Sequence, residues 1–144
     1  MDPLRGHCLN SDFVPKNKVS VWTMLNDNPK YIEGGLKLGR SILQHTVEDK
    51  IEVDIIVMEL AAKPLAEEVW VGLREIGYLR CTVDRIPPPN FEKTLPRFRE
   101  KFAILHVWTM TMYDTVLFLD ADTFITGPIK NLLSMVRASK SNFL

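Results

Sequence analysis

The residues best placed to do chemistry are two aspartates that directly follow an apolar run. Asp120 and Asp122, separated by Ala121, come after residues 116–119. A short apolar run is typical of a strand buried on both faces of a parallel sheet. Ligands of such sheets bind beyond the carboxyl ends of the strands, where these acids would lie. Two crowded carboxylates favour a cation, and a hard divalent metal that also contacts phosphate is the natural partner.

The elements that would position these acids alternate along the chain. Hydrophobic periodicity predicts strands over residues 19–25, 51–58, 78–83 and 115–119, and helices over residues 31–45, 65–76, 97–113 and 129–136. This order indicates an α/β fold with a mostly parallel sheet and helices on both faces. In the third helix, the inward face is expected to carry Phe102, Leu105, Trp108 and Met112. Three prolines within residues 86–90 predict an irregular loop.

Three glycines lie inside the first predicted helix, at Gly34, Gly35 and Gly39. Glycine weakens a helix, so its presence there indicates close approach by another backbone or by a ligand. Because the glycines are not in the strand-to-helix turn, they do not form a dinucleotide-binding fingerprint. The pattern argues against a nicotinamide or flavin oxidoreductase.

Composition favours one globular domain and excludes several classes of partner. The chain has 144 residues and a formal net charge of zero, which gives no indication of nucleic-acid binding or of a basic membrane patch. No run is long enough to span a bilayer. Residues 1–17 lack the apolar core of a signal peptide and are expected to form a loose polar lead-in.

The two cysteines, Cys8 and Cys81, do not form a CxxC pair. We therefore expect two free thiols in a reducing compartment. The cytoplasm is the default location, while the Golgi or another secretory compartment stays open.

The two aspartates by themselves allow several interpretations. They could simply end a strand, with one of them capping a turn. They could also belong to a phosphatase of the haloacid dehalogenase type, which uses two acids after an apolar strand. That pattern requires a threonine two places after the second acid, where this chain has Phe124, while Thr123 comes one place after it.

Two longer stretches resemble the glycogenin-like family, glycosyltransferase family 8, which has the GT-A fold. Residues 21–45 contain Leu25-Asn26-Asp27-Asn28 and Tyr31, and residues 101–133 contain Leu105-His106-x-Trp108 together with the two aspartates. The resemblance implies a Rossmann-like nucleotide-sugar-binding fold. It also implies that residues 18–144, after the polar lead-in of residues 1–17, are the N-terminal portion of a glycosyltransferase domain, apparently truncated.

The resemblance implies transfer of a hexose from a UDP-sugar, with retention of configuration, to an unidentified glycan, protein or lipid acceptor. Asp120 and Asp122 would bind Mn²⁺, with Mg²⁺ as an alternative, and Ala121 would present its backbone to the nucleotide. The positions that match uridine-binding residues of the family are Leu25, Asp27, Asn28 and Tyr31. A different class of function stays open: a truncated, non-catalytic nucleotide-binding or interaction module. Homo-oligomerisation also stays open.

The chain departs from the family pattern at a lysine that reaches the donor phosphates. This position is Ile104 here, and Lys101, Arg97 or Arg99 could replace the missing charge. The family's third metal ligand, a late histidine, and its acceptor-binding residues have no counterpart in this sequence. His106 and Trp108 are expected to be packing residues on a helix.

Overall fold

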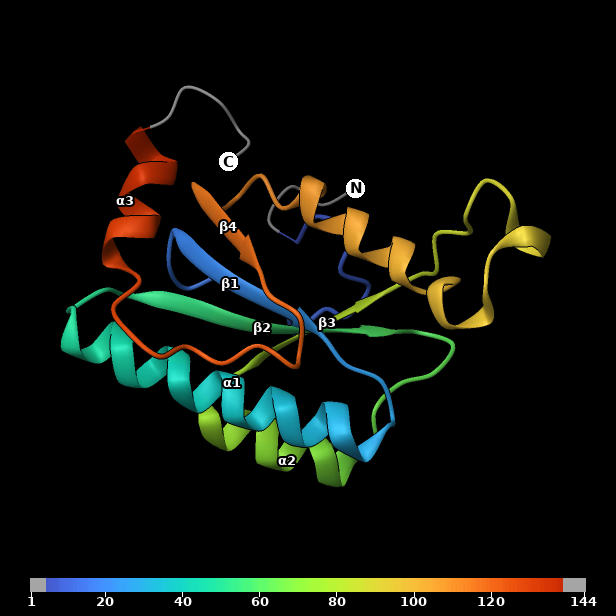
Figure 1. The fold of residues 1–144 in the computed structure, drawn as a ribbon, viewed down its shortest axis with the longest axis horizontal. Helices are drawn as coiled ribbons and strands as arrows, with labels where there is room; N and C mark the ends of the chain where they lie inside the picture. The colour runs from blue at the N-terminus through green and yellow to red at the C-terminus, as the bar shows by residue number, and fades with distance from the viewer. Residues whose placement is uncertain (1–4, 139–144) are drawn as a thin grey trace.

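The computed structural model describes residues 5–138 and arranges them as a sheet with helices on its two faces (Figure 1). The strands are β1 (Val19–Met24), β2 (Val53–Leu60), β3 (Leu79–Val83) and β4 (Thr115–Phe118). The α-helices are α1 (Pro29–Glu48), α2 (Glu67–Ile76) and α3 (Lys130–Ala138), and the 3₁₀ helices are η1 (Phe91–Lys93), η2 (Pro96–Phe98) and η3 (Lys101–Thr109). Each predicted strand is present, with bounds that differ by at most two residues.

The four strands form one sheet in the order β3-β2-β1-β4, and every neighbouring pair is parallel. Parallel neighbours require crossover connections, which α1 and α2 supply between the first three strands. The α/β fold class with a mostly parallel sheet is therefore confirmed, and the arrangement is consistent with the N-terminal part of a GT-A fold.

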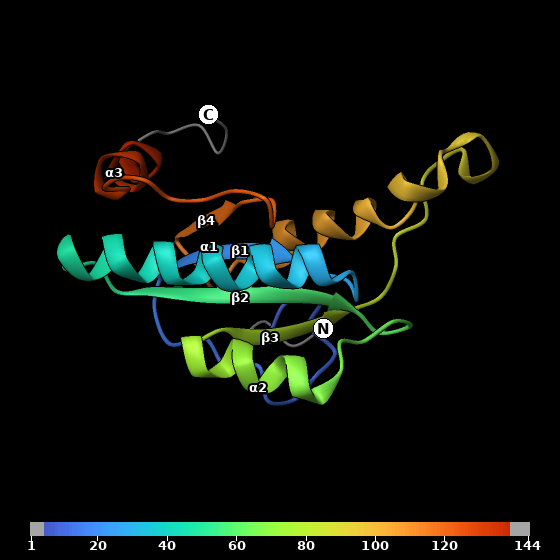
Figure 2. The same cartoon turned by 60° about the horizontal axis from the view of Figure 1, so that its bottom comes forward.

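The two faces of the sheet are covered differently. α1 and α2 lie together against one face, and η3 runs across the other, as the two views show (Figures 1 and 2). Because side chains alternate along a strand, Val21 and Ile55 pack under α1 and α2, whereas Trp22 and Ile56 pack toward η3 and the N-terminal segment. Each face thus has its own apolar core.

The glycines of α1 mark close contacts, as the sequence predicts. A Cβ atom on Gly39 would lie 2.6 Å from the ring of Tyr78, so only glycine lets this ring pack against the helix. The Tyr78 hydroxyl donates a hydrogen bond of 2.7 Å to the carbonyl oxygen of Gly35. Burial of this hydroxyl raises the pKa of Tyr78.

The third predicted helix is wrong in its type and in its buried face. The segment forms η2 and η3, which have about three residues per turn, so residues three apart share a face. The face toward the sheet carries Ala103 and His106, whereas Leu105 and Trp108 are about half exposed. His106 is a packing residue as predicted, and Trp108 is not.

Residues 5–17 differ from the loose lead-in that we expected, and residues 1–4 of that lead-in lie outside the described part of the chain. Phe13 is 1% exposed and belongs to the core, and the Leu9 amide donates to the Thr82 carbonyl at 2.7 Å. Cys8 forms a disulfide with Cys81 of β3, so the expectation of two free thiols is wrong. The segment is thereby fixed to the edge strand of the sheet.

β4 is less buried than an apolar run predicts. Val116, Leu117 and Phe118 have intermediate exposure. The reason is topological, because β4 pairs only with β1 and forms an edge of the described sheet, whereas β2 has neighbours on both sides.

Among the described residues, no helix has the length and apolar character needed to cross a membrane.

Candidate functional site

A cleft opens at the carboxyl edge of the sheet, where β1 and β4 end side by side. The Leu119 amide donates to the Trp22 carbonyl at 2.9 Å, and the Leu25 amide donates to the Met58 carbonyl at 3.2 Å, so the segments leaving the strands stay together. The residues that line the cleft are Met24, Leu25, Asn26, Tyr31, Leu60, Lys63, Arg97, Glu100, Lys101, Ile104, Phe118, Asp120, Ala121 and Asp122. Four segments that are far apart in the sequence, at residues 24–31, 60–63, 97–104 and 118–122, therefore meet here.

Asp120 and Asp122 both line this cleft and are exposed, while Ala121 between them is buried. The Thr123 amide donates to the Asp120 carbonyl at 3.0 Å, which closes a turn directly after the strand. Neither carboxylate has a hydrogen bond or ion pair with another side chain within the described part of the chain. Two exposed carboxylates are thus held on one turn without a protein cation.

Helix α1 holds this turn in place at two points. A Cβ atom on Gly34 would overlap the carbonyl oxygen of Ala121, so the turn rests directly on the helix backbone. Further along the same helix, the Ser41 hydroxyl accepts a hydrogen bond of 3.0 Å from the Ile125 amide, just after the turn. The glycines inside the helix predicted close approach by another backbone, and at Gly34 that backbone is the carbonyl of Ala121.

The residues predicted to hold uridine are only partly in the cleft. Leu25 and Tyr31 line it, and Tyr31 is 44% exposed. Asn28 instead caps α1, because its side-chain oxygen accepts a hydrogen bond of 3.0 Å from the Lys30 amide. Asp27 is exposed next to it and does not line the cleft.

Two of the three cations proposed to replace the missing lysine reach the cleft. Arg97 and Lys101 line it, and each lies near the ring of Phe98, at 4.7 Å and 5.5 Å. Arg99 instead donates to the Thr94 carbonyl at 3.0 Å and does not line the cleft. Ile104 lines the cleft as an apolar residue, so the wall there carries no charge at that position.

Sequence reasoning missed a charged pair in the cleft. Lys63 follows β2, and its ammonium lies 2.9 Å from a carboxylate oxygen of Glu100, which also accepts from Arg85 at 3.1 Å. The hydrogen bond from Lys63 is the largest influence on the pKa of Glu100 and lowers it, so Glu100 stays ionised at neutral pH. A signal for Lys63 was available, since the carboxyl end of a second central strand also points to the ligand edge.

The cleft suits a metal ion that is held by two protein carboxylates and by the phosphates of a bound substrate. Mg²⁺ and Mn²⁺ prefer oxygen, and such ions are often held by one or two carboxylates together with substrate phosphates and water. Asp120 and Asp122 fit this donor set. No cluster of three or more histidine, cysteine, aspartate or glutamate residues exists among residues 5–138. The remaining ligands would therefore be phosphate oxygens and water.

Comparison with known proteins relates the chain to glycosyltransferases. No family model matches it. An Arabidopsis thaliana protein that carries the name UDP-glucuronate:xylan alpha-glucuronosyltransferase 4 is 27% identical over 125 residues, which cover 86% of this chain and 21% of that protein. Human glycogenin-2 is 28% identical over 119 residues, covering 78% of this chain and 22% of that protein. Rabbit glycogenin-1 is 25% identical over 116 residues, covering 78% of this chain and 33% of that protein.

The chain is thus a distant relative of glycosyltransferase family 8 and corresponds to an N-terminal portion of its members. It spans about a fifth to a third of the length of the curated relatives that it matches. The predicted resemblance to the glycogenin-like family is confirmed at this level.

Proposed function

We propose that this chain binds the UDP-sugar donor of a metal-dependent, retaining glycosyltransferase that transfers a hexose. The observation that carries the proposal is the cleft, which is lined by Asp120 and Asp122 and also by three cations, Lys63, Arg97 and Lys101. Such a cleft suits a ligand that combines a cation with an anion, as a metal-bound diphosphate does. The relation to glycosyltransferases favours this function over the phosphatase alternative.

In this proposal each group has a separate role. Asp120 and Asp122 would hold Mn²⁺, or Mg²⁺, and the metal would stabilise the negative charge of UDP as it leaves. Arg97 and Lys101 supply positive charge for the phosphates. Tyr31, which lines the cleft and is 44% exposed, offers an aromatic face on which a uracil base could stack.

The other residues predicted to bind the nucleotide divide into two that line the cleft and one that acts indirectly. Leu25 and Ala121 line the cleft and keep a direct role beside the nucleotide. Asn28 is assigned an indirect role, because its side chain begins α1 and so helps to place Tyr31. The acceptor, whether glycan, protein or lipid, would be bound by groups other than the cleft residues named here.

Calorimetric titration with UDP, with and without Mn²⁺, tests the proposal. We expect the native chain to bind UDP more tightly with the metal, and a variant with both Asp120→Ala and Asp122→Ala to lose this dependence. Asp114→Ala is the matched control, because Asp114 is an exposed acid at the other end of β4. The proposal is refuted if the native chain, shown to be folded, binds no UDP, or if the double variant binds it equally well.

The disulfide also bears on location. Disulfides persist in oxidising compartments and are rare in the cytosol. We infer from the Cys8–Cys81 bond that the chain works in a secretory compartment, which replaces the cytoplasmic default. Thiol labelling of the protein isolated from its native source, before and after reduction, tests this: labelling only after reduction is expected, and two reactive thiols before reduction would contradict it.

A further inference from the structure

We propose that Lys63 binds the diphosphate of the donor, in place of the family lysine whose position is Ile104 in this chain. The inference rests on the proposed function, because it names a residue of the same cleft. It concerns a part of the chain, the turn after β2, in which the sequence patterns gave no candidate.

Lys63 lies on a turn that is fixed at both ends. The Ala61 amide donates to the Val83 carbonyl at 2.9 Å, and the Lys63 amide donates to the Leu60 carbonyl at 3.1 Å. Beyond the turn, the Leu65 amide donates to a carboxylate oxygen of Glu59 at 2.8 Å. The backbone of Lys63 is therefore held in the wall of the cleft, while its side chain is 63% exposed.

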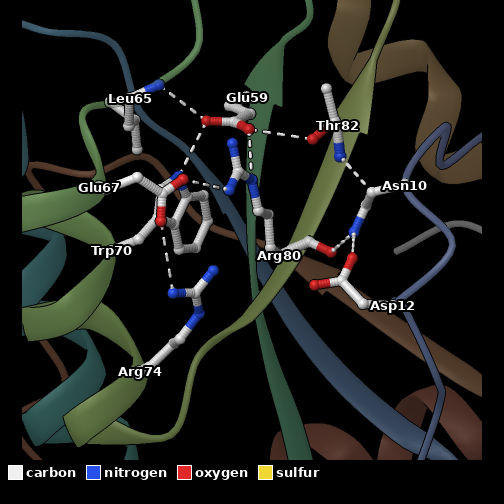
Figure 3. A network of polar contacts seen from close by, with 9 residues as sticks. All are labelled: Asn10, Asp12, Glu59, Leu65, Glu67, Trp70, Arg74, Arg80 and Thr82. Carbon is white, nitrogen blue, oxygen red and sulfur yellow. Dashed lines mark hydrogen bonds and ion pairs between the residues drawn. The ribbon is translucent and has the colours of Figure 1, made fainter.

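Glu59 is the anchor of this turn and belongs to a polar network (Figure 3). Its buried carboxylate accepts further hydrogen bonds from Trp70 at 3.0 Å, Thr82 at 2.9 Å and Arg80 at 2.6 Å. Burial lowers the pKa of Arg80, but its hydrogen bonds to Glu59 and Glu67 outweigh burial and raise it overall. Since each oxygen of Glu59 is satisfied, the network fixes the start of the turn instead of offering a ligand site.

The ion pair with Glu100 gives Lys63 a resting position from which it can move. One oxygen of Glu100 contacts both Lys63 and Arg85, at 2.9 Å and 3.1 Å. If Lys63 turns toward a phosphate, Glu100 keeps Arg85 as its partner and does not become an unpaired charge. The Lys63 side chain is 63% exposed and the Glu100 side chain 25%. An ion pair at the surface contributes little free energy, so a diphosphate with two or more negative charges can compete for the ammonium.

The position of Lys63 complements the other two cations. Arg97 and Lys101 come from η2 and η3, whereas Lys63 comes from the turn after β2. A diphosphate in the cleft would therefore meet positive charge from three separate elements, and Asp120 and Asp122 from a fourth. This arrangement offers contacts to both phosphates at once.

Calorimetry with uridine and with UDP, both in the presence of Mn²⁺, tests the inference. We expect Lys63→Ala to weaken UDP binding about tenfold, as for loss of a hydrogen bond to a charged group, and to leave uridine binding unchanged. Glu100→Gln should tighten UDP binding, because Lys63 then leaves a weaker partner. Lys93→Ala is the matched control, since Lys93 is an exposed lysine on η1 outside the cleft and should bind UDP like the native chain.

The outcomes separate this inference from the function on which it rests. If the native chain binds UDP and Lys63→Ala binds it equally well, the role of Lys63 is refuted and the proposed function stands. The role is also refuted if Lys63→Ala weakens the binding of uridine and of UDP to the same degree, because the lost contact would then not be to phosphate. If the native chain binds neither compound, both proposals are overturned.

Discussion

Replacement of Gly34 by alanine tests how helix α1 positions the two aspartates. The new Cβ atom would overlap the Ala121 carbonyl oxygen and lie 3.2 Å from the Ala121 carbonyl carbon. Both atoms are backbone, so the turn itself must move. Overpacking of this kind costs about 1–3 kcal/mol, whereas alanine in place of glycine inside a helix gains about 0.5–1 kcal/mol.

Gly72→Ala in helix α2 is the matched control for this substitution. Its Cβ atom would meet only a side-chain atom of Leu36 at 3.9 Å, an ordinary contact. The control should therefore show the helix gain alone, about 0.5–1 kcal/mol. The difference in free energy of unfolding between the two variants isolates the overlap and should be about 1–3 kcal/mol.

Urea unfolding followed by circular dichroism measures this difference, and calorimetry with UDP and Mn²⁺ measures its consequence at the site. Gly34→Ala should weaken UDP binding, because the displaced Ala121 lies between Asp120 and Asp122. Gly72→Ala should bind UDP like the native chain. Equal stability and equal UDP affinity of the two variants would refute the claim that the helix sets the geometry of the turn.

Three further predictions concern what holds the fold together. The Cys8–Cys81 bond closes a loop of 73 residues, so Cys8→Ser should lower the free energy of unfolding by about 4 kcal/mol on the chain-entropy model; an unchanged urea midpoint with and without reductant would argue against the bond. Glu59→Gln should cost about 3–5 kcal/mol because it breaks a buried ion pair, while Glu67→Gln, at a side chain 71% exposed, should cost at most about 1 kcal/mol. Equal urea midpoints for these two variants would contradict the network. Burial raises the pKa of Tyr113, and the hydrogen bond to Asp54 raises it further. At alkaline pH the native state therefore keeps a proton that the unfolded chain loses. The contribution of Tyr113 to the free energy of unfolding is complete below about pH 10 and falls as the pH rises above that value. Tyr113→Phe should make that alkaline fall shallower, and an unchanged slope would exclude the tyrosine as its source.

The alternation of strands and helices could be predicted because it depends on local periodicity. The order of strands could not, since it depends on which segments meet after folding. Residues 116–119 are as apolar as a central strand, but β4 lies at the edge of the described sheet. The pairing of Cys8 with Cys81 was missed for the same reason, because the two cysteines are 73 positions apart in the sequence and only the fold brings them together.

The third predicted helix failed for a different physical reason. Phe102, Leu105 and Trp108 are spaced by three, which is close to the α-helical period. In a 3₁₀ helix, residues three apart share a face, so the neighbouring row of Ala103 and His106 forms an equally regular face. Periodicity alone could not decide which row faces the sheet.

At the cleft, Asp120 and Asp122 were predictable because an apolar run followed by acids is a local signal. Lys63 and Glu100 were not found in this way. The place of Lys63 after a central strand was a usable signal, but its contact with Glu100 joins the turn after β2 to the segment before η3, and no spacing in the sequence reveals that contact.

The most direct test of the central claim is a crystal structure of the chain with UDP and Mn²⁺. We expect one metal ion bound to the carboxylates of Asp120 and Asp122 and to the diphosphate, with the uracil base against Tyr31. UDP bound elsewhere on the molecule, or a metal ion in the cleft that touches neither aspartate, would contradict it.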